Sequence, residues 1–242
     1  MNQPAVLDGL KCVCGAPHFP TIDRQGTHLI TECNGVGNYR LKLHGAMEDE
    51  IMAIGSNCEF RVRREERDCF KIAFPDCNKR PDVTFVSKNL ITDISVKQPY
   101  STRCGLSLQQ ALTVERAANE GFKGKNRKYG AIAEDNNLNF LPLIFETTGR
   151  IQKDALLEMD TWFKHGSDVR KIDKGVLSTY WLRSISCKLQ KIAAQAIIQR
   201  SFKMASDLNP FLEDSSQAHA RSYEAMMLFD YVNSGSEYHC QQ

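Results

Sequence analysis

The sequence has no long apolar run, no signal peptide and almost no net charge, and each of these shortages narrows the class of protein. No segment approaches the roughly 18 apolar residues that a membrane-spanning helix needs, and the first residues lack the regions of a secretory leader. We therefore expect an intracellular protein, with the nucleus as one candidate compartment and no membrane partner. A net charge of +2 over 242 residues does not by itself identify a nucleic-acid partner.

Residues 1–38 lack sustained hydrophobic periodicity and are rich in glycine, proline, cysteine and histidine. The chain's nine cysteines are an odd number, and in a reducing compartment they are better interpreted as thiols or metal ligands than as a disulfide framework. Three thiols and one imidazole suit a tetrahedral zinc site. The segment therefore predicts a structural Zn²⁺ held by Cys12, Cys14, His28 and Cys33.

A hairpin with one aspartate for each strand is predicted between residues 82 and 97. Asp82 follows the rigid Pro81 and opens the first strand, and a polar turn at 87–89 leads to the second strand, which carries Asp93. Two carboxylates on adjacent strands repel unless a divalent cation lies between them, and oxygen ligands suit Mg²⁺ or Mn²⁺. The spacing favours a metal site for phosphodiester hydrolysis, although an ordinary hairpin with a turn-forming and a solvated aspartate has the same pattern.

Further candidate residues precede the hairpin. Apolar side chains at helical spacing predict an amphipathic helix from about residue 39 to 54, and His44 and Glu48 lie one turn apart beside its apolar stripe. Alternation over 60–66 predicts a strand that carries Glu66. A position beside the stripe either reaches a site at the edge of the sheet or is solvated, which is the more common outcome.

The rest of the chain adds predicted helices over 106–129, 151–165 and 175–208, one buried strand over 139–147 and a polar tail after residue 210. This mixture indicates an α/β protein. Basic side chains gather in the segments around the hairpin, which indicates contact with the phosphates of a nucleic acid unless they are scattered surface cations. They are Arg61, Arg63, Arg64, Lys79, Arg80, Lys88, Lys97, Lys123, Lys125, Arg127 and Lys128.

In chain order the features are a Cys/Cys/His/Cys module, a helix with Arg40 and His44, the run Arg80-Pro81-Asp82, Asp93 on a strand, and Lys125-x-x-Lys128-Tyr129 on a helix. That order resembles the restriction-like endonuclease at the C-terminus of site-specific non-LTR retrotransposons, and the related tail domains of other reverse-transcriptase elements. The resemblance covers residues 11–165. It implies a PD-(D/E)xK nuclease core, a mixed central sheet flanked by helices, at 39–165, with a zinc module at 1–38 and a helical extension and tail at 166–242.

The resemblance also implies that Asp82 and Asp93 are the metal ligands, with Glu48 or Glu66 completing the site. A second nuclease pattern is suggested by the histidine that precedes the Pro-Asp pair. A helix-borne histidine such as His44 can join two acids at a Mn²⁺ site, as in cap-snatching RNA endonucleases.

The catalytic lysine of the family stands two residues after the second acid, where this chain has Ser95. The family tolerates a lysine that has moved. The candidates here are Lys97 on the same strand face, or Lys125 and Lys128 on the following helix. The match to the Lys-x-x-Lys-Tyr run favours the helix pair, whereas loss of the lysine altogether would leave an inactive fold kept for binding.

Three functions are compatible with the sequence. The first is a metal-dependent endonuclease that hydrolyses phosphodiester bonds in DNA. The second is a catalytically inactive nucleic-acid-binding module of the same fold, and the third is a cap-snatching-like Mn²⁺-dependent RNA endonuclease. We expect Mg²⁺ or Mn²⁺ and structural Zn²⁺ as cofactors and a nucleic acid as partner, in a chain that either stands alone or belongs to a larger reverse-transcriptase protein.

Overall fold

The computed structural model describes residues 12, 39–66, 68–99 and 115–208, with the backbone alone from residue 200 on. The chain divides into two compact units, Asn38–Ala194 and a unit made of both terminal segments. Of the terminal unit, the described residues are Cys12, which is buried, and the end of one helix. The predicted polar tail lies outside the described residues. In the described part of the chain, none of the helices is both long and apolar enough to cross a membrane.

A four-stranded mixed sheet lies at the centre of the larger unit, with the strand order β1-β2-β3-β4. β1 (Val62–Arg64), β2 (Val83–Phe85) and β3 (Leu90–Lys97) are antiparallel neighbours. β4 (Asn139–Glu146) runs parallel to β3, from the pair Leu90 and Asn139 onward. A parallel neighbour requires a crossover connection, so the chain must leave the sheet between β3 and β4.

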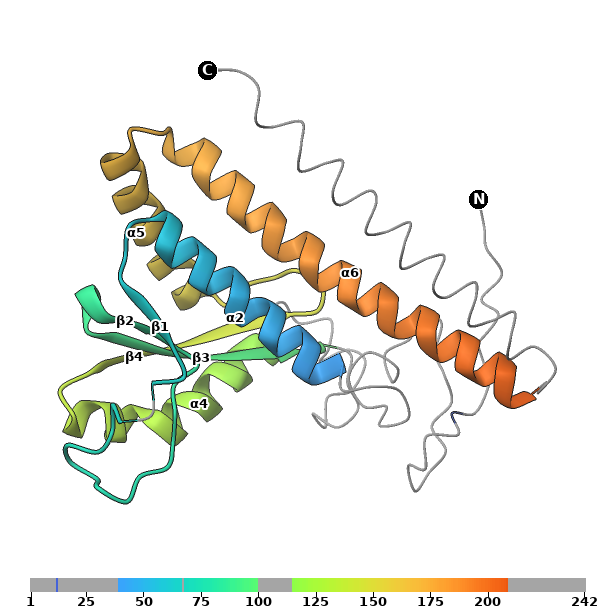
Figure 1. Cartoon of the computed structure of the whole chain (residues 1–242), viewed down its shortest axis with the longest axis horizontal. Coiled ribbons are helices and arrows are strands. Elements are labelled where there is room, and N and C mark those ends of the chain that lie inside the picture. Colours follow the sequence, from blue (N-terminus) through green and yellow to red (C-terminus); the bar gives the residue numbers. More distant parts are fainter. Residues whose placement is uncertain (1–11, 13–38, 67, 100–114, 209–242) are drawn as a thin grey trace. The chain divides into compact units, whose positions relative to one another are not determined.

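Helices cover both faces of this sheet. α4 (Arg116–Asp135) lies in the crossover on one face, and α2 (Tyr39–Asn57) and α5 (Lys153–Arg170) lie on the other face (Figure 1). The long helix α6 (Lys174–Leu208) follows α5 and contacts α2 through an ion pair between Lys188 and the buried Glu50. The prediction of an α/β protein with a mixed sheet flanked by helices is therefore confirmed.

Each face of the sheet has its own apolar core. On the α2 and α5 side, Phe85 packs against Trp162, with ring centroids 4.3 Å apart, and both side chains are fully buried. On the α4 side, Phe70 and Ile91 pack with Tyr129 on the helix. Strand β3 separates these two cores because its side chains alternate between the faces.

The two edges of the sheet differ. β1 forms one edge and is three residues long. β4 forms the other edge, where Gln152 donates its backbone N–H to the carbonyl of Ile144 and Phe145 forms a bridge with Ile151. Pro142 lies two residues before Ile144, so its backbone faces the same outer side of β4, and proline has no N–H to offer there.

The strand predicted over 60–66 was wrong in extent. β1 covers Val62–Arg64, because Glu65 takes a left-handed backbone conformation with φ 44° that ends the strand. Glu66 therefore leaves the strand and pairs with Arg63, with 2.7 Å between Oε1 and Nη1. By contrast, the hairpin was confirmed: β2 begins at Val83 and β3 spans Leu90–Lys97 as predicted.

The helix predicted over 106–129 also differs in its described part. α4 begins at Arg116 after Glu115, which has φ 64°, and continues to Asp135. The predicted residues 106–114 lie outside the described residues. The predicted helices over 151–165 and 175–208 correspond to α5 and α6, with α5 extending five residues further to Arg170.

Helices α2 and α5 approach closely at Gly166. A Cβ atom there would lie 3.0 Å from the Cα of Cys58 and 2.8 Å from its sulfur. We expect Gly166→Ala to destabilise the fold by about 1–3 kcal/mol, the usual cost of overpacking. Gly130→Ala is the matched control in α4, where a Cβ would meet nothing within 4 Å, and it should stabilise the helix by about 0.5–1 kcal/mol. Urea denaturation of both variants checks this, and equal stabilities would contradict it.

Candidate metal centre

Helix α2 presents two polar side chains toward the sheet. Its buried residues Leu43, Met47 and Ile51 form the stripe that packs on the core. His44 and Glu48 are four residues apart, so they lie one above the other beside that stripe. Glu48 is 7% exposed although it is a carboxylate, which places it in the interior rather than on the solvated face.

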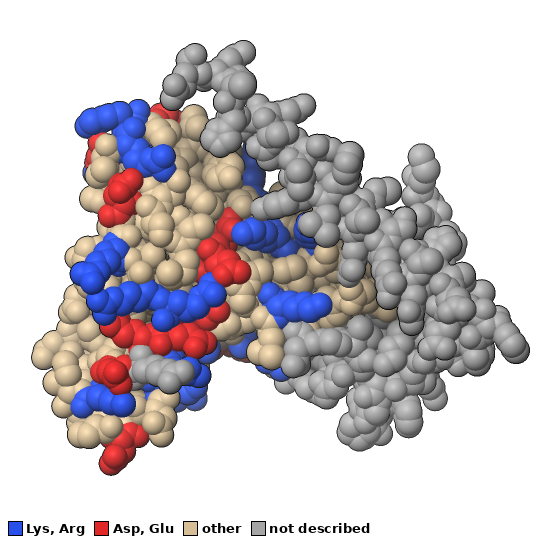
Figure 2. Space-filling model, viewed as in Figure 1, with Lys and Arg blue, Asp and Glu red and all other residues tan. Residues whose placement is uncertain are grey.

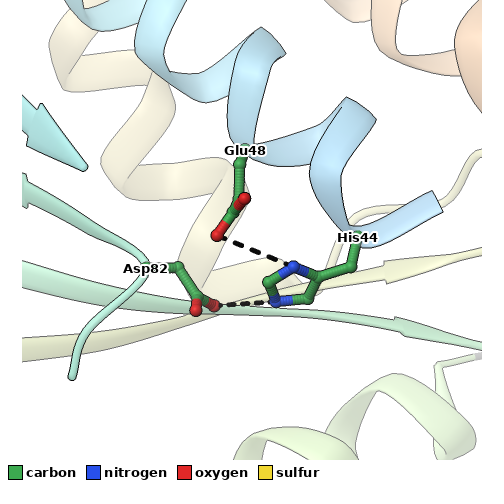
Figure 3. Close-up of side chains that lie close together, drawn as sticks. All are labelled: His44, Glu48 and Asp82. Carbon is green, nitrogen blue, oxygen red and sulfur yellow. Dashed lines mark hydrogen bonds and ion pairs between the residues drawn. The ribbon is translucent and has the colours of Figure 1, made fainter. Parts of the chain in front are cut away.

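Asp82 is the residue just before β2, and its carboxylate lies close to these two side chains. Its backbone N–H donates to the carbonyl of Thr92, and its Oδ2 accepts the N–H of Ile94, so both ends of the residue are held by β3. Figure 3 shows the side chains of His44 and Glu48 descending from α2 toward this carboxylate. The position of the carboxylate is therefore fixed by the register of the hairpin.

The three side chains form a compact set of nitrogen and oxygen atoms. His44 Nε2 lies 3.1 Å from Asp82 Oδ2, and His44 Nδ1 lies 3.6 Å from Glu48 Oε1. One ligand atom from each residue lies within 4.8 Å of the other two. Glu48 Oε1 is buried and has no hydrogen-bond partner among the described residues. A buried carboxylate oxygen without a donor carries a desolvation cost, and a divalent cation would offset it.

The residues present fit such a cation. Two carboxylates suit Mg²⁺ and Mn²⁺, and an added imidazole favours Mn²⁺, which binds nitrogen ligands more readily. His44, Glu48 and Asp82 would hold the ion.

The electrostatics of the cluster favour protons where no cation is bound. The hydrogen bond to Asp82 raises the pKa of His44 above its ordinary 6.5, and the negative charges of Asp82, Glu48 and Asp93 add to this against the effect of burial. Burial raises the pKa of Glu48 above its ordinary 4.5, and His44 partly offsets that rise. Protons and a cation therefore compete for the same side chains.

This competition predicts a pH dependence of Mn²⁺ binding. His44 must lose its proton to bind a cation, so the apparent Mn²⁺ affinity should rise between about pH 5 and 8 and keep rising above the ordinary imidazole pKa. Without metal the sign is opposite: the stability from the protonated His44 is complete below pH 6.5 and is lost as the pH rises through the raised pKa. Titrations at several pH values check this, with His44→Gln expected to remove most of the dependence. An affinity independent of pH in the unaltered protein would contradict it.

Asp93 lies beside this cluster on β3 but belongs to a different pair. The register of Val83 with Thr92 places Asp82 opposite Asp93. Asp93 is 3% exposed, and its Oδ2 forms an ion pair with Lys125 of α4. Burial raises the pKa of Asp93, whereas the contacts with Lys125 and Tyr129 lower it. Asp82 raises it again, which indicates that the two carboxylates feel each other's charge.

The structure separates the three candidate lysines. Lys125 contacts Asp93 directly. Lys128 lies over the Tyr129 ring, with its Nζ 4.6 Å from the centroid. Lys97 packs its stem under α4, where a Cβ on Gly121 would come within 2.9 Å of the Lys97 Cε. Lys125 thus forms an ion pair with an acid of the hairpin, and the charges of Asp93 and Asp82 also reach Lys128.

The acidic candidates are separated in the same way. Glu48 lies within the three-residue cluster, whereas Glu66 pairs with Arg63 at the surface. Tyr129 was named in the sequence only as part of a motif, yet its side chain contributes to the electrostatics of Asp93. Its position four residues after Lys125, on the same face of α4, is the signal that could have identified it.

The basic side chains around the hairpin are interleaved with acids. Cationic and anionic side chains lie next to one another on the face drawn in Figure 2. Arg64 pairs with Asp49, and Arg80 pairs with Glu65, with 3.0 Å between Nη1 and Oε2. Surface pairs of this kind contribute little stability, so they remain available to exchange partners with phosphates.

The predicted zinc site falls largely outside the described residues. Cys12 is buried, and Cys14, His28 and Cys33 lie in the part that the structure does not describe. We still expect one Zn²⁺ per chain in protein purified without chelator, and its loss on Cys33→Ala, because metal binding supplies the folding free energy of such small modules. Elemental analysis measures this. Full zinc retention by Cys33→Ala, with Cys187→Ala as control, would show that the ligands were misassigned.

Comparison with known proteins does not assign the chain. No protein-family model matches it, and no curated protein matches its sequence significantly.

Proposed function

We propose that the chain is a metal-dependent endonuclease that hydrolyses phosphodiester bonds in nucleic acid, with DNA as the first candidate substrate. The observation that carries the proposal is the cluster of His44, Glu48 and Asp82 next to the ion pair between the buried Asp93 and Lys125. Metal-assisted phosphodiester hydrolysis uses acidic side chains that bind a metal ion, with a cationic side chain beside them.

The protein side chains would divide the work. A bound divalent cation would supply charge that polarises the phosphate and lowers the pKa of a water molecule. Glu48 and Asp82 would hold the divalent cation, and the backbone N–H of Ile94 would keep the Asp82 carboxylate in place. Lys125 would offset the charge that develops on the phosphate oxygens, while Asp93 positions its ammonium group.

The architecture supports the same proposal. A mixed sheet with helices on both faces is what the resemblance to PD-(D/E)xK nucleases implies. The two acids that the proposal uses stand on neighbouring strands, Asp82 just before β2 and Asp93 within β3. The role of the lysine passes to α4, which agrees with the absence of a lysine at Ser95.

A Mn²⁺-dependent RNA endonuclease of the cap-snatching type is the second candidate, and His44 is the observation that favours it. The imidazole contacts Asp82 and lies beside Glu48, and its side chain is 34% exposed. A histidine among the carboxylates shifts the preference of the site from Mg²⁺ toward Mn²⁺. The choice between DNA and RNA is therefore a matter for the substrate arms of the experiment.

Calorimetric titration of Mn²⁺ and Mg²⁺ into the full chain tests the proposal, together with cleavage of labelled DNA and RNA of one sequence. We expect Mn²⁺ to bind more tightly than Mg²⁺ and to support cleavage. Asp82→Asn and His44→Ala should weaken Mn²⁺ binding at least about tenfold, as loss of a ligand or of its support does. His165→Ala is the matched control, because His165 stacks on Phe60 instead, with centroids 4.6 Å apart.

The outcomes separate the candidate functions. Cleavage of DNA supports the first candidate, and cleavage of RNA alone supports the second. Nucleic-acid binding without Mn²⁺ binding or cleavage would leave the inactive binding module and overturn the nuclease proposal. Equal Mn²⁺ affinities for the unaltered protein and Asp82→Asn would show that the cluster is not the metal centre.

A further inference from the structure

The loop between β1 and β2 keeps two large apolar side chains in solvent. Ile72 is 85% exposed and Phe74 is 41% exposed. We call these two residues the tip of the β1–β2 loop (residues 68–80). Single exposed apolar residues need no explanation, but here two of them stand two positions apart on a segment that leads directly to Asp82.

Packing and hydrogen bonds hold the loop that carries the tip in place. Phe70 is fully buried and lies against Tyr129, with ring centroids 6.3 Å apart. The backbone N–H of Ala73, between the two tip residues, donates to the side chain of Asn136 at 2.9 Å. Phe74 N–H donates to the carbonyl of Phe70 at 3.1 Å, which closes one helical turn. The tip is therefore held in one position with its apolar surface outward, an arrangement that costs little entropy when it binds a ligand.

Three cations gather around the ring of Tyr129, against which Phe70 of the loop packs. Lys79, Lys125 and Lys128 place their ammonium groups 5.7, 5.9 and 4.6 Å from the centroid of the Tyr129 ring. Lys79 also donates to the backbone carbonyl of Lys128 at 3.3 Å, which ties the end of the loop to α4. Lys125 and Lys128 belong to α4 and Lys79 to the loop, and such a group of cations suits successive phosphates.

Helix α4 gives the distance between the candidate metal centre and the tip. Lys125, at the site, and Asn136, under the tip, are separated by eleven residues of α4 and its C-cap. At 1.5 Å per residue, this is about 16 Å along the axis. Phosphates of one strand in a duplex are spaced about 3.4 Å along the axis, so the tip lies about five nucleotides from the reacting phosphate. Figure 1 shows the loop extending beside α4, away from the sheet.

We infer that the tip of the β1–β2 loop inserts against an unstacked base of the substrate strand, about five nucleotides from the bond that is cleaved. The inference rests on the proposed function, since the distance to the tip is counted from the metal centre of that function. Phe74 offers a ring for stacking, and Ile72 offers a wedge between neighbouring bases. Lys79 and Lys128 hold the intervening phosphates. The substrate is therefore a strand that is opened or already single at that point.

The test uses the full chain carrying Asp93→Asn, which prevents cleavage, and oligonucleotides with 2-aminopurine at one position after another. We expect fluorescence to rise at a single position upon binding, as the base leaves its stack. Ile72→Ser with Phe74→Ser should abolish that rise and weaken binding about tenfold, the effect of losing one stacked base. Val176→Ser with Tyr180→Ser is the control, because these side chains are 63% and 62% exposed on α6.

Salt dependence separates the tip from the cations. The tip variants should leave the slope of log affinity against log salt unchanged, whereas Lys79→Ala should reduce it by about one contact. Unchanged affinity and fluorescence in the tip variants would overturn the inference, as would an equal loss in the control. A shift from dimer to monomer in the tip variants by sedimentation would also overturn it, because the tip would then join two copies of the chain.

The readouts distinguish this inference from the proposed function. They measure binding and base stacking and do not require catalysis. A tip effect in an unaltered protein that does not cleave would support base insertion by the tip, but it would overturn the nuclease and the distance counted from the cleaved bond. Cleavage by the tip variants with unaltered binding would support the nuclease and overturn the inference. DNA and RNA probes of the same sequence identify which strand the tip recognises.

Discussion

Asp82→Asn and Asp93→Asn are each expected to lower the rate of single-turnover cleavage at least about a hundredfold, the usual effect of losing one contact with the transition state. Both variants should bind nucleic acid as the unaltered protein does, because neither carboxylate attracts phosphate. Asparagine keeps the oxygen that accepts the Ile94 N–H, so the position of residue 82 is preserved. The loss therefore reports the charge of the carboxylate rather than the shape of the hairpin.

For Asp93→Asn, we expect the thermal stability of the apo protein to hold or rise although cleavage falls. Burial raises the pKa of this carboxylate above its ordinary 3.8. The penalty for its charge is absent below that value and complete above the raised pKa, so the folded state loses stability as the pH rises through it. Asp93→Asn removes the penalty but leaves Lys125 without its partner. We expect the apo protein to keep or gain thermal stability at neutral pH, with the gain shrinking in acid.

Asp160→Asn is the matched control, because Asp160 is exposed and pairs with Lys174 on the α5 and α6 side. It should change neither cleavage nor stability measurably. Cleavage at the rate of the unaltered protein by Asp82→Asn or Asp93→Asn would overturn the assignment of the site. A large loss of thermal stability in Asp93→Asn would show that the ion pair, rather than burial, dominates its energetics.

Lys125→Ala is expected to lose about 100- to 1,000-fold in single-turnover cleavage at saturating Mn²⁺. The Lys-x-x-Lys-Tyr run favoured Lys125 or Lys128 over Lys97, and the contact with Asp93 now favours Lys125. Lys128→Ala should mainly weaken binding, since its ammonium group lies over the Tyr129 ring. Lys97→Ala should cleave normally, because its stem packs under α4. A loss confined to Lys97→Ala would sink this ranking.

A double variant separates the chemistry of Lys125 from the fold. Lys125→Ala alone leaves Asp93 buried without its cation, which should lower thermal stability. Adding Asp93→Asn removes the unpaired charge and should restore stability without restoring cleavage. Recovery of cleavage in the double variant would mean that Lys125 acts only by neutralising Asp93.

The hairpin and the helix before it could be predicted because their signals are local. The turn residues at 87–89 mark the start of β3, and Asn89 takes the left-handed conformation that a turn residue at that place tolerates. The apolar stripe of α2 likewise fixes which way His44 and Glu48 point. His44 and Asp82 are 38 residues apart in the sequence. Their contact could still be anticipated, because the sequence predicted both the helix face of His44 and the hairpin that carries Asp82.

Other features depend on contacts that no local pattern encodes. Glu65 and Glu115 adopt positive φ without glycine or asparagine, so the true start of α4 and the end of β1 carried no signal. Choosing Glu48 over Glu66 required the length of β1, and choosing among the lysines required the packing of α4 on β3. The anchoring of the β1–β2 loop on Asn136 is a pairing over 63 residues between polar groups.

The two edges of the sheet limit what can join it. Strands of a second molecule extend a sheet by matching a row of free donors and acceptors. β1 offers a row only three residues long, and the outer side of β4 lacks a donor at Pro142 and is already bonded at Ile144. Concentrated or partly unfolded protein should therefore resist edge-to-edge polymerisation, and replacing Pro142 by threonine would remove that protection at the strand next to Asp93.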